Sequence, residues 1–301
     1  MRYRGKAGIM NLSVTRLFPA HQRDLALEGL YLEHDLHTKG RSGKPYVYSN
    51  FISSLDGRIA IADAAHTTHV VPAACANPRD WRLYQELAGQ ADLLVTSGRY
   101  FRQSLLGEAQ DELPLGSAQK FDDIREWRAT RGLLPQPDIA IMSSSLKIPL
   151  AALEQYRTRR IHVVTGEDAD PGRVAAMQEN DINVIRAGSG IKVNGRKMID
   201  ELAQHGYRSI YAIAGPAVFH TLLASRVVDR LYLTITQQIL GGDNYDTLSR
   251  GNPLQPAQGM QLVGLCHDPH APADAGQLFG VFEPGKQPPD PFPGPKDHYT
   301  P

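Results

Sequence analysis

The sequence predicts an α/β protein: a central, mostly parallel sheet flanked by helices, followed by a C-terminal antiparallel hairpin. Between residues 46 and 236, short apolar runs alternate with segments that carry helix-start and helix-stop signals. Repeated strand–helix–strand units place parallel strands in one sheet that is covered on both faces. After Gly241-Gly242, two strand-like runs are joined by a loop rich in proline. These runs predict a hairpin at the edge of the sheet.

Each element has its own local signal. The first strand is rich in aromatic and β-branched residues and ends at the turn pair Asp56-Gly57. The first helix follows a capping residue, Asn77, and has Pro78 at its first position. The predicted strands are residues 46–53, 91–96, 138–142, 160–165, 182–186, 209–214, 229–236, 260–266 and 277–282. The predicted helices are residues 78–89, 118–131, 149–156, 172–180, 195–205 and 216–225.

Two regions fall outside this alternation. Residues 98–137 are irregular apart from the helix over 118–131, and are either an insertion near a cleft or a surface loop. From residue 284 onward, seven of the last 18 residues are proline, which predicts an extended, disordered tail.

Composition limits the class of protein. The 301 residues carry 32 Lys+Arg and 32 Asp+Glu, so no net field attracts nucleic acid or an anionic membrane. Two cysteines give neither a disulfide framework nor a paired-cysteine zinc site, which favours a reducing cytoplasm. No apolar run is long enough to span a bilayer. We therefore expect a cytoplasmic protein whose partner is a small molecule or another protein.

The strongest candidate for a binding site is the strand–helix junction at Gly215-Pro216. Ligands of such sheets bind beyond the carboxyl ends of the strands. Here the strand over 209–214 leads straight into a helix, and we expect the N–H groups of residues 217–219 to point outward as a phosphate-binding site. A simple tight corner between strand and helix explains the pattern equally well.

Two further strand ends carry hydroxyl groups beside a glycine. Thr96-Ser97-Gly98-Arg99 adds a guanidinium group that can bind phosphate, and Thr165-Gly166 repeats the hydroxyl and glycine. Both are compatible with a dinucleotide lying across the sheet. The G-x-G-x-x-G fingerprint of the ordinary dinucleotide fold is absent from the sequence.

Other motifs favour structural roles. Ser144-x-x-Lys147 lacks the companion motifs of a serine acyltransferase, so a polar turn is the better interpretation. His66, His69 and Cys75 have no metal-ligand spacing, and we predict no metal site. Trp81 and Trp127 lie in predicted helices, as core or surface anchors rather than base-stacking platforms.

Four ordered motifs resemble one family, the pyrimidine reductases of riboflavin biosynthesis, which form the C-terminal domain of the bifunctional deaminase–reductase. Residues 50–60 (NFISSLDGRIA) are similar to its S-L-D-G-x-I-A signature. The other stretches are residues 90–98, 145–149 and 214–223, the last followed by residues 228–235 and by Gly241-Gly242. The resemblance divides the chain into an N-terminal extension (1–44), a reductase domain (45–283) and the tail (284–301).

The resemblance implies a dihydrofolate-reductase-like fold and NADPH as cofactor. It places the cofactor at strand ends and at one helix N-terminus, and it leaves the catalytic residue unknown. The implied cofactor residues are Ala60, Thr96, Ser97, Gly98, Thr165, Gly215, Pro216, Ala217, Val218 and Phe219. Asp56 matches the signature next to the substrate, although capping the turn is the favoured role for its carboxylate, with Gly57 at positive φ.

The departures from the family pattern fall on the substrate side. A glutamate that contacts substrate in the family is replaced by Ile213. An arginine that the family has late in the helix before the strand over 91–96 is replaced by Ala88. The segment that helps to hold the phosphoribosyl group is replaced by residues 98–107, in which Arg99 and Arg102 can supply a new phosphate clamp.

Three functions are compatible with the sequence. The first is the family's reaction, hydride transfer to the anomeric carbon of a ribosylamino pyrimidine such as 5-amino-6-(5-phosphoribosylamino)uracil. The second is reduction of a different heterocycle or imine, and the third is a nucleotide-binding protein without catalysis. A deaminase motif is absent from residues 1–44. The resemblance also implies a homodimer, for which the exposed edge of the hairpin is the expected interface.

Overall fold

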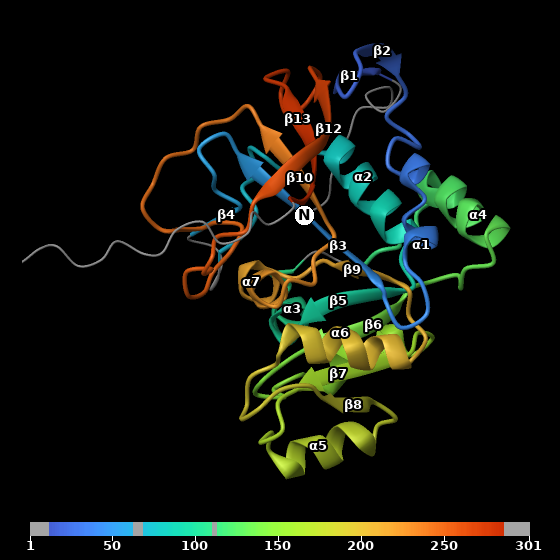
Figure 1. Cartoon of the computed structure of the whole chain (residues 1–301), viewed down its shortest axis with the longest axis vertical. Helices are drawn as coiled ribbons and strands as arrows, with labels where there is room; N and C mark the ends of the chain where they lie inside the picture. The colour runs from blue at the N-terminus through green and yellow to red at the C-terminus, as the bar shows by residue number, and fades with distance from the viewer. Residues whose placement is uncertain (1–11, 63–68, 110–112, 286–301) are drawn as a thin grey trace, which may run out of the picture.

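The computed structural model describes residues 12–62, 69–109 and 113–285. An 11-stranded sheet runs through the whole molecule in the order β2-β1-β12-β13-β10-β3-β9-β5-β6-β7-β8 (Figure 1). A separate two-stranded sheet joins β11 to β4. The strands are β1 (Val14–Phe18), β2 (Gln22–Leu25), β3 (Tyr46–Ser54), β4 (Ala60–Ile61), β5 (Leu93–Ser97), β6 (Asp138–Met142), β7 (Ile161–Thr165), β8 (Asn183–Arg186), β9 (Ser209–Ala212), β10 (Arg230–Thr236), β11 (Tyr245–Asp246), β12 (Met260–Asp268) and β13 (Gln277–Pro284).

Helices cover both faces of this sheet. The α-helices are α1 (Leu36–Lys39), α2 (Pro78–Gly89), α3 (Gly98–Leu105), α4 (Asp122–Thr130), α5 (Pro171–Gln178), α6 (Gly195–Gln204) and α7 (Pro216–Ala224). Short 3-10 helices are η2 (Leu32–His34), η3 (Gln119–Phe121) and η4 (Leu150–Tyr156). The segment predicted as a helix over 149–156 is therefore present in the tighter 3-10 form.

The predicted fold class is confirmed. Seven neighbouring strands, from β10 through β8, are mutually parallel, and β13 and β12 follow as an antiparallel hairpin. The cores on the two faces differ in their helices. One face packs against α2, α3 and η4 around Leu83, Leu87 and Phe101, and the other packs against α6 and α7 around Leu202 and Leu222.

The predicted position of the hairpin at the sheet edge is wrong. Strand β12 pairs along its outer side with β1, where Arg16 lies opposite Cys266, and β2 continues the sheet beyond β1. These two strands come from the region predicted to be an N-terminal extension, because their short, charged sequences carry no alternating apolar pattern. The edge of the hairpin is therefore covered within the chain.

The N-terminal region is also bound to α2 through a buried carboxylate. The Glu86 side chain accepts hydrogen bonds from the N–H groups of Gly29 (2.6 Å) and Tyr31 (2.9 Å), and it pairs with Arg82. Gln90 accepts from the N–H of Leu36 and donates to the carbonyl of Tyr31. These bonds satisfy backbone groups that would otherwise be buried without partners. Residues 27–36 are thus part of the folded core.

Helix α3 was not predicted. It begins directly after β5 at Gly98, and Ser97 at its N-cap makes no side-chain capping bond, so the usual helix-start signal is missing. Burial of Phe101, which is 0% exposed, fixes the helix against the core. The proline-rich segment predicted to be disordered lies outside the described residues beyond residue 285, and Pro284 itself ends β13.

Candidate functional site

The predicted site residues follow strands whose carboxyl ends meet at one edge of the sheet. Strand β9 lies between β3 and β5, although it comes much later in the chain. The strand order reverses there, and α/β sheets bind ligands in the crevice at such a point. Ser97 at the end of β5 pairs with Met142 at the end of β6, which brings the start of α3 next to the loop that follows β6.

The first turns of α3 and the loop after β6 form a cavity of about 240 Å³. It contains predicted cofactor residues, Ser97 and Gly98, together with predicted substrate residues, Arg99 and Arg102. The remaining lining residues come from the end of β6 and the loop that follows it: Met142, Ser143, Ser144 and Ser145. Residues assigned to two different ligands therefore share one small site.

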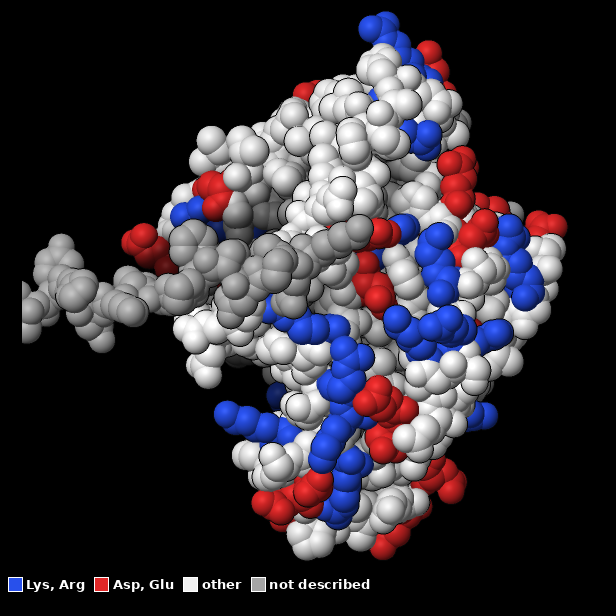
Figure 2. All heavy atoms as spheres, in the orientation of Figure 1, with Lys and Arg blue, Asp and Glu red and all other residues white. Residues whose placement is uncertain are grey.

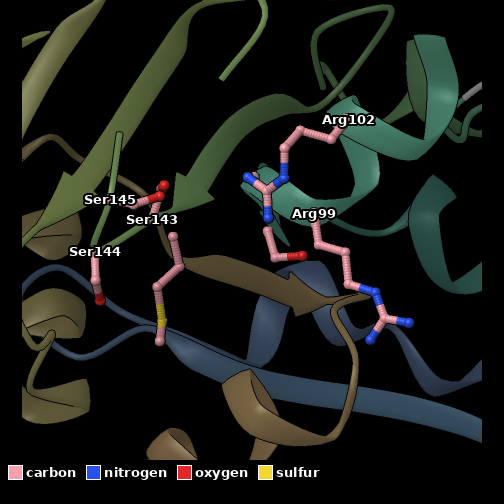
Figure 3. Close-up of a pocket in the computed structure, with 8 residues that line it drawn as sticks. Arg99, Arg102, Ser143, Ser144 and Ser145 are labelled. Carbon is pink, nitrogen blue, oxygen red and sulfur yellow. The ribbon is translucent and has the colours of Figure 1, made fainter. Parts of the chain in front are cut away.

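The two arginines of the cavity point in different directions. Figure 3 shows the guanidinium group of Arg102 turned toward the serines and that of Arg99 turned away from them. Arg102 is held by a hydrogen bond of 2.8 Å to the carbonyl of Lys147, whereas Arg99 is exposed. A Cβ atom on Gly98 would lie 3.1 Å from Ser143 Oγ and 3.3 Å from Arg102 Nη1. Glycine therefore allows these side chains to close around the floor of the cavity.

Sequence reasoning missed Ser143, Ser144 and Ser145 as lining residues. They directly follow the strand over 138–142, so the criterion applied to Thr96 and Thr165, a hydroxyl at a strand end, would have found them. Ser144 was considered only for its match to the S-x-x-K pattern with Lys147, which was interpreted as a polar turn. In the structure the Ser143 hydroxyl accepts from the N–H of Leu146 at 3.1 Å, a turn contact that agrees with the polar-turn interpretation.

Thr96 and Thr165 do not present their side chains to a ligand in this structure. Thr96 is 2% exposed and Thr165 is 0% exposed, because both lie within the core of the sheet. Among the described residues, none bonds to the Thr165 hydroxyl. A cofactor contact through either hydroxyl, as the resemblance implies, would need the strand end to move.

The helix N-terminus at Gly215 differs in part from the phosphate-binding site predicted from the sequence. The N–H groups of Val218 and Phe219 both donate to the carbonyl of Gly215, at 3.1 and 3.2 Å, so they do not point outward. Their side chains belong to the core. Pro216 has no N–H, and no described acceptor bonds to the exposed N–H groups of Gly215 and Ala217. The expected anion site is therefore reduced to these two donors.

Asp56 has a structural role, as the turn chemistry favoured. Its carboxylate accepts from the N–H groups of Leu240 (3.1 Å) and Gly241 (2.9 Å) and pairs with Arg58. The hydrogen bond from the Ser54 hydroxyl, followed by the bond from Gly241, lowers the pKa of Asp56 to about 2. Gly57 has the expected positive φ, +84°. The signature thus ties the end of β3 to the segment that follows β10.

Ala60 lies in the short sheet formed by β4 and β11, opposite Asp246. Asp246 is nearly buried and accepts from His69, whose other ring nitrogen lies 2.8 Å from Asn244. His66, the other histidine considered for a metal, lies outside the described residues. Within the described part of the chain, no group of three or more His, Cys, Asp or Glu side chains could hold a metal ion.

The two residues that depart from the family pattern on the substrate side, Ile213 and Ala88, are both uncharged. Ile213 follows β9 and packs against the core on the α2 face. Ala88 is 0% exposed near the end of α2, where Arg128 of α4 donates to the carbonyls of Gly89 and Ala91. An arginine at residue 88 would have to compete with Arg128 for this space. The substrate contacts of the family are therefore not reproduced at these positions.

The sheet and the cavity at its edge together define the class of protein. A sheet whose carboxyl edge carries a pocket of hydroxyl and guanidinium groups is typical of α/β proteins that bind phosphate-bearing ligands. No helix of the described residues is both long and apolar enough to cross a membrane.

The model of one family, the RibD C-terminal domain, matches residues 45–270. The chain therefore belongs to this family, whose members are NAD(P)H-dependent reductases. The family resemblance and the α/β fold with a mostly parallel sheet, both predicted from the sequence, are confirmed. A comparison with curated proteins finds no match.

Solved structures agree with the fold. A pyrimidine reductase-like protein from Corynebacterium diphtheriae is 18% identical with a TM-score of 0.61, over 81% of this chain and 93% of that one. Riboflavin biosynthesis reductase Rib7 from Saccharomyces cerevisiae is 15% identical with a TM-score of 0.54, over 85% and 99%. RibD from Acinetobacter baumannii is 15% identical with a TM-score of 0.55, over 81% and 59%. At these identities the likeness concerns the fold.

Proposed function

We propose that this protein is an NADPH-dependent reductase that acts on a small, pyrimidine-like substrate. The observation that carries the proposal is the cavity between β5 and β6, which lies at the edge where a reductase of this fold needs its cofactor. Its hydroxyl and guanidinium groups fit a phosphate group in charge and in hydrogen-bonding capacity. A neutral chain needs such local groups to hold an anionic cofactor.

Within this proposal, Arg99, Arg102 and Ser143 to Ser145 hold a phosphate of the cofactor rather than a phosphate of the substrate. The hydroxyl-rich loop after β6 completes a site around Ser97 and Gly98, residues that the resemblance assigns to the cofactor. The N–H groups of Gly215 and Ala217 offer a second, weaker anion site at the end of β9. When bound, NADPH supplies the hydride, and the protein orients the reactants and excludes water.

The proposal also concerns the identity of the substrate. Reduction of 5-amino-6-(5-phosphoribosylamino)uracil is the function that the family resemblance favours. Ile213 and Ala88 favour a different heterocycle or imine, since neither can form the polar contacts expected for the phosphoribosyl compound. In both cases the reaction adds a hydride to a carbon of a C=N or equivalent bond and a proton to the nitrogen.

The direct test is NADPH oxidation, followed at 340 nm, with the deaminated riboflavin precursor and with a panel of oxidised heterocycles. Turnover of the precursor, with rescue of a riboflavin auxotroph that lacks its reductase, supports the first substrate. Turnover of another panel member supports the second. Binding of NADPH without hydride transfer to any compound would leave a nucleotide-binding protein and contradict the proposed reaction.

A cytoplasmic homodimer is a further part of the proposal. The interface expected at the hairpin edge is occupied by β1, so the proposed contact moves to the broad face of the hairpin. There the side chains of Leu262, Leu265 and Leu278 are half-buried within the chain. Figure 2 shows mixed charges over the lower half of the molecule and few over β12 and β13. A monomeric mass by light scattering would contradict the dimer.

A further inference from the structure

Two histidine side chains meet at the edge of the sheet opposite the cofactor cavity. His162 lies near the start of β7, and His205 directly follows α6. Figure 1 shows the arrowheads of β5 and β7 on the left, so the amino ends of these strands lie on the right, away from the cavity. The proposed reductase function uses neither histidine.

The side chain of Asn183, the first residue of β8, shows where the two imidazole rings point. Its amide nitrogen lies 2.9 Å from Nδ1 of His162 and 3.4 Å from Nε2 of His205. An amide nitrogen only donates hydrogen bonds, so each of these ring nitrogens turns a lone pair toward it. Two imidazole lone pairs that converge on one point are an arrangement that can bind a metal ion.

The tautomer of His162 is set by hydrogen bonds on its other side. The Asp138 carboxylate accepts from the Tyr207 hydroxyl at 2.7 Å and from the N–H of Arg160 at 2.9 Å. Because the Tyr207 proton is directed at Asp138, the Tyr207 oxygen accepts from Nε2–H of His162 at 2.9 Å. Nδ1 of the neutral ring therefore carries the lone pair. Burial, which lowers the pKa of His162 to about 4, also favours the neutral ring.

This chain of hydrogen bonds is typical of the surroundings of a metal-binding histidine. Such a histidine donates its second ring N–H to a neighbouring acceptor, which fixes the orientation of the ring. His162, Tyr207 and Asp138 are 1%, 6% and 5% exposed, so one ligand is held in place by the core. His205 and Asn183 are exposed, so an ion and its water ligands can reach the site from solvent.

The distance between the two rings fits a shared ion. Two imidazoles that bind one Zn²⁺ in tetrahedral geometry, with Zn–N distances of about 2.0–2.1 Å, have ring centroids about 5 Å apart. The centroids of His162 and His205 are 4.9 Å apart, with 46° between the ring planes. Rotation of the Asn183 amide would free the space between the two nitrogens and turn its oxygen toward an ion.

We propose that Nδ1 of His162 and Nε2 of His205 bind a divalent cation of the zinc class, namely Zn²⁺, Cu²⁺ or Ni²⁺. The Asn183 amide oxygen and water complete the coordination. Imidazole ligands suit these metals, whereas Mg²⁺ and Ca²⁺ prefer oxygen ligands. The ion joins the end of α6 to β7 and β8, and its binding does not depend on the reductase function.

The test titrates Zn²⁺ by calorimetry into the full-length protein without an affinity tag, at pH 7.5. We expect one saturable site in the wild-type protein and its loss in His205→Ala. Tyr207→Phe should weaken binding by about ten-fold, because it removes the acceptor-and-donor link between His162 and Asp138 while it keeps the ring. His21→Ala changes an exposed histidine elsewhere and should leave the affinity unchanged. Mg²⁺ should not bind at this site.

Electron paramagnetic resonance with one equivalent of Cu²⁺ counts the nitrogen ligands directly. We expect coupling to two imidazole nitrogens in the wild-type protein and to one in His205→Ala. His205 is exposed, so this variant should fold normally, as circular dichroism can check. Absence of saturable Zn²⁺ binding to the wild-type protein would overturn the proposal. Undiminished binding by His205→Ala, or a single coupled nitrogen in the wild-type protein, would overturn it as well.

Discussion

Arg79 and Asp80 are neighbours in α2, yet their surroundings are opposite. The guanidinium group of Arg79 is 0% exposed and meets Asp268, which also accepts from Gln277 at 2.9 Å and from the N–H of His270. Asp80 is only partly exposed, no ion pair between it and a cation occurs among the described residues, and burial raises the pKa of its carboxyl group to about 6. A buried charge with complete partners stabilises the arrangement around it, whereas an incompletely paired charge costs stability and is available to a ligand.

The largest effect on stability is expected for the buried ion pair between Arg79 and Asp268. Asp268→Ala removes the counter-charge of Arg79 and leaves a fully buried cation, which should lower the free energy of unfolding by about 3–5 kcal/mol. Urea denaturation measures the change. The control is Glu154→Gln in the exposed pair with Arg157, for which we expect a much smaller change because solvent screens the pair. Similar losses in the two variants would contradict the structural role of the Arg79–Asp268 pair.

The next effect concerns the anion site at α7. Gly215→Asp places a carboxylate at the two open N–H groups and should weaken NADPH binding by about 100-fold, through repulsion of the pyrophosphate. A Cβ atom at Gly215 meets nothing within 4 Å and its φ is −69°, so the variant should fold normally. Gly215→Asn is the neutral control of the same size. Unchanged affinity in Gly215→Asp would remove this residue from the cofactor site.

The unpaired carboxyl group of Asp80 should have the opposite effect on stability. In the unfolded chain this group loses its proton near its usual pKa of 3.8, but in the folded protein only near 6. Stability is therefore lost as the pH rises through this window, and the loss is complete above it. Asp80→Asn should raise the free energy of unfolding by about 1–2 kcal/mol at pH 8 and have no effect at pH 3. A destabilised Asp80→Asn at pH 8 would show that the carboxylate is fully paired.

The smallest effect separates the two arginines of the cavity. Arg99→Ala removes an exposed guanidinium group and should raise the Kd for NADPH by about ten-fold, with little change for NADH, if this group binds the extra phosphate. Arg102→Ala should have a smaller effect, because Arg102 is already bound to the carbonyl of Lys147. Equal losses for NADPH and NADH would assign the cavity to a phosphate that the two cofactors share.

Much of this molecule follows from local patterns in the sequence. The capped helix at Asn77, the buried strands and the Gly215-Pro216 junction lie where periodicity and capping place them. The first two strands were missed, because β2 (Gln22–Leu25) is exposed and charged and depends on β1 and β12 for its pairing. Contacts distant in sequence decide such elements, and one chain carries no local signal for them.

The candidate site, too, was predicted only in part from the sequence. Strand-end hydroxyls and glycines indicated the edge of the sheet, and Ser97, Gly98, Arg99 and Arg102 do meet there. Sequence spacing does not reveal which hydroxyls are buried, and Thr96 and Thr165 lie in the core. Nor does it reveal that Arg102 is held by the carbonyl of Lys147, 45 positions away, since this contact depends on how α3 packs beside the loop after β6. Side-chain accessibility comes from tertiary packing, so it has no local pattern.

The most direct test of the central claim is a titration of the purified protein with NADPH, followed by quenching of tryptophan fluorescence and repeated with Arg99→Ala. The account predicts saturable binding of one NADPH per chain, weaker binding of NADH, and loss of this preference in the variant. Absence of NADPH binding to the folded wild-type protein would contradict the assignment of the cavity between β5 and β6 to a reductase cofactor.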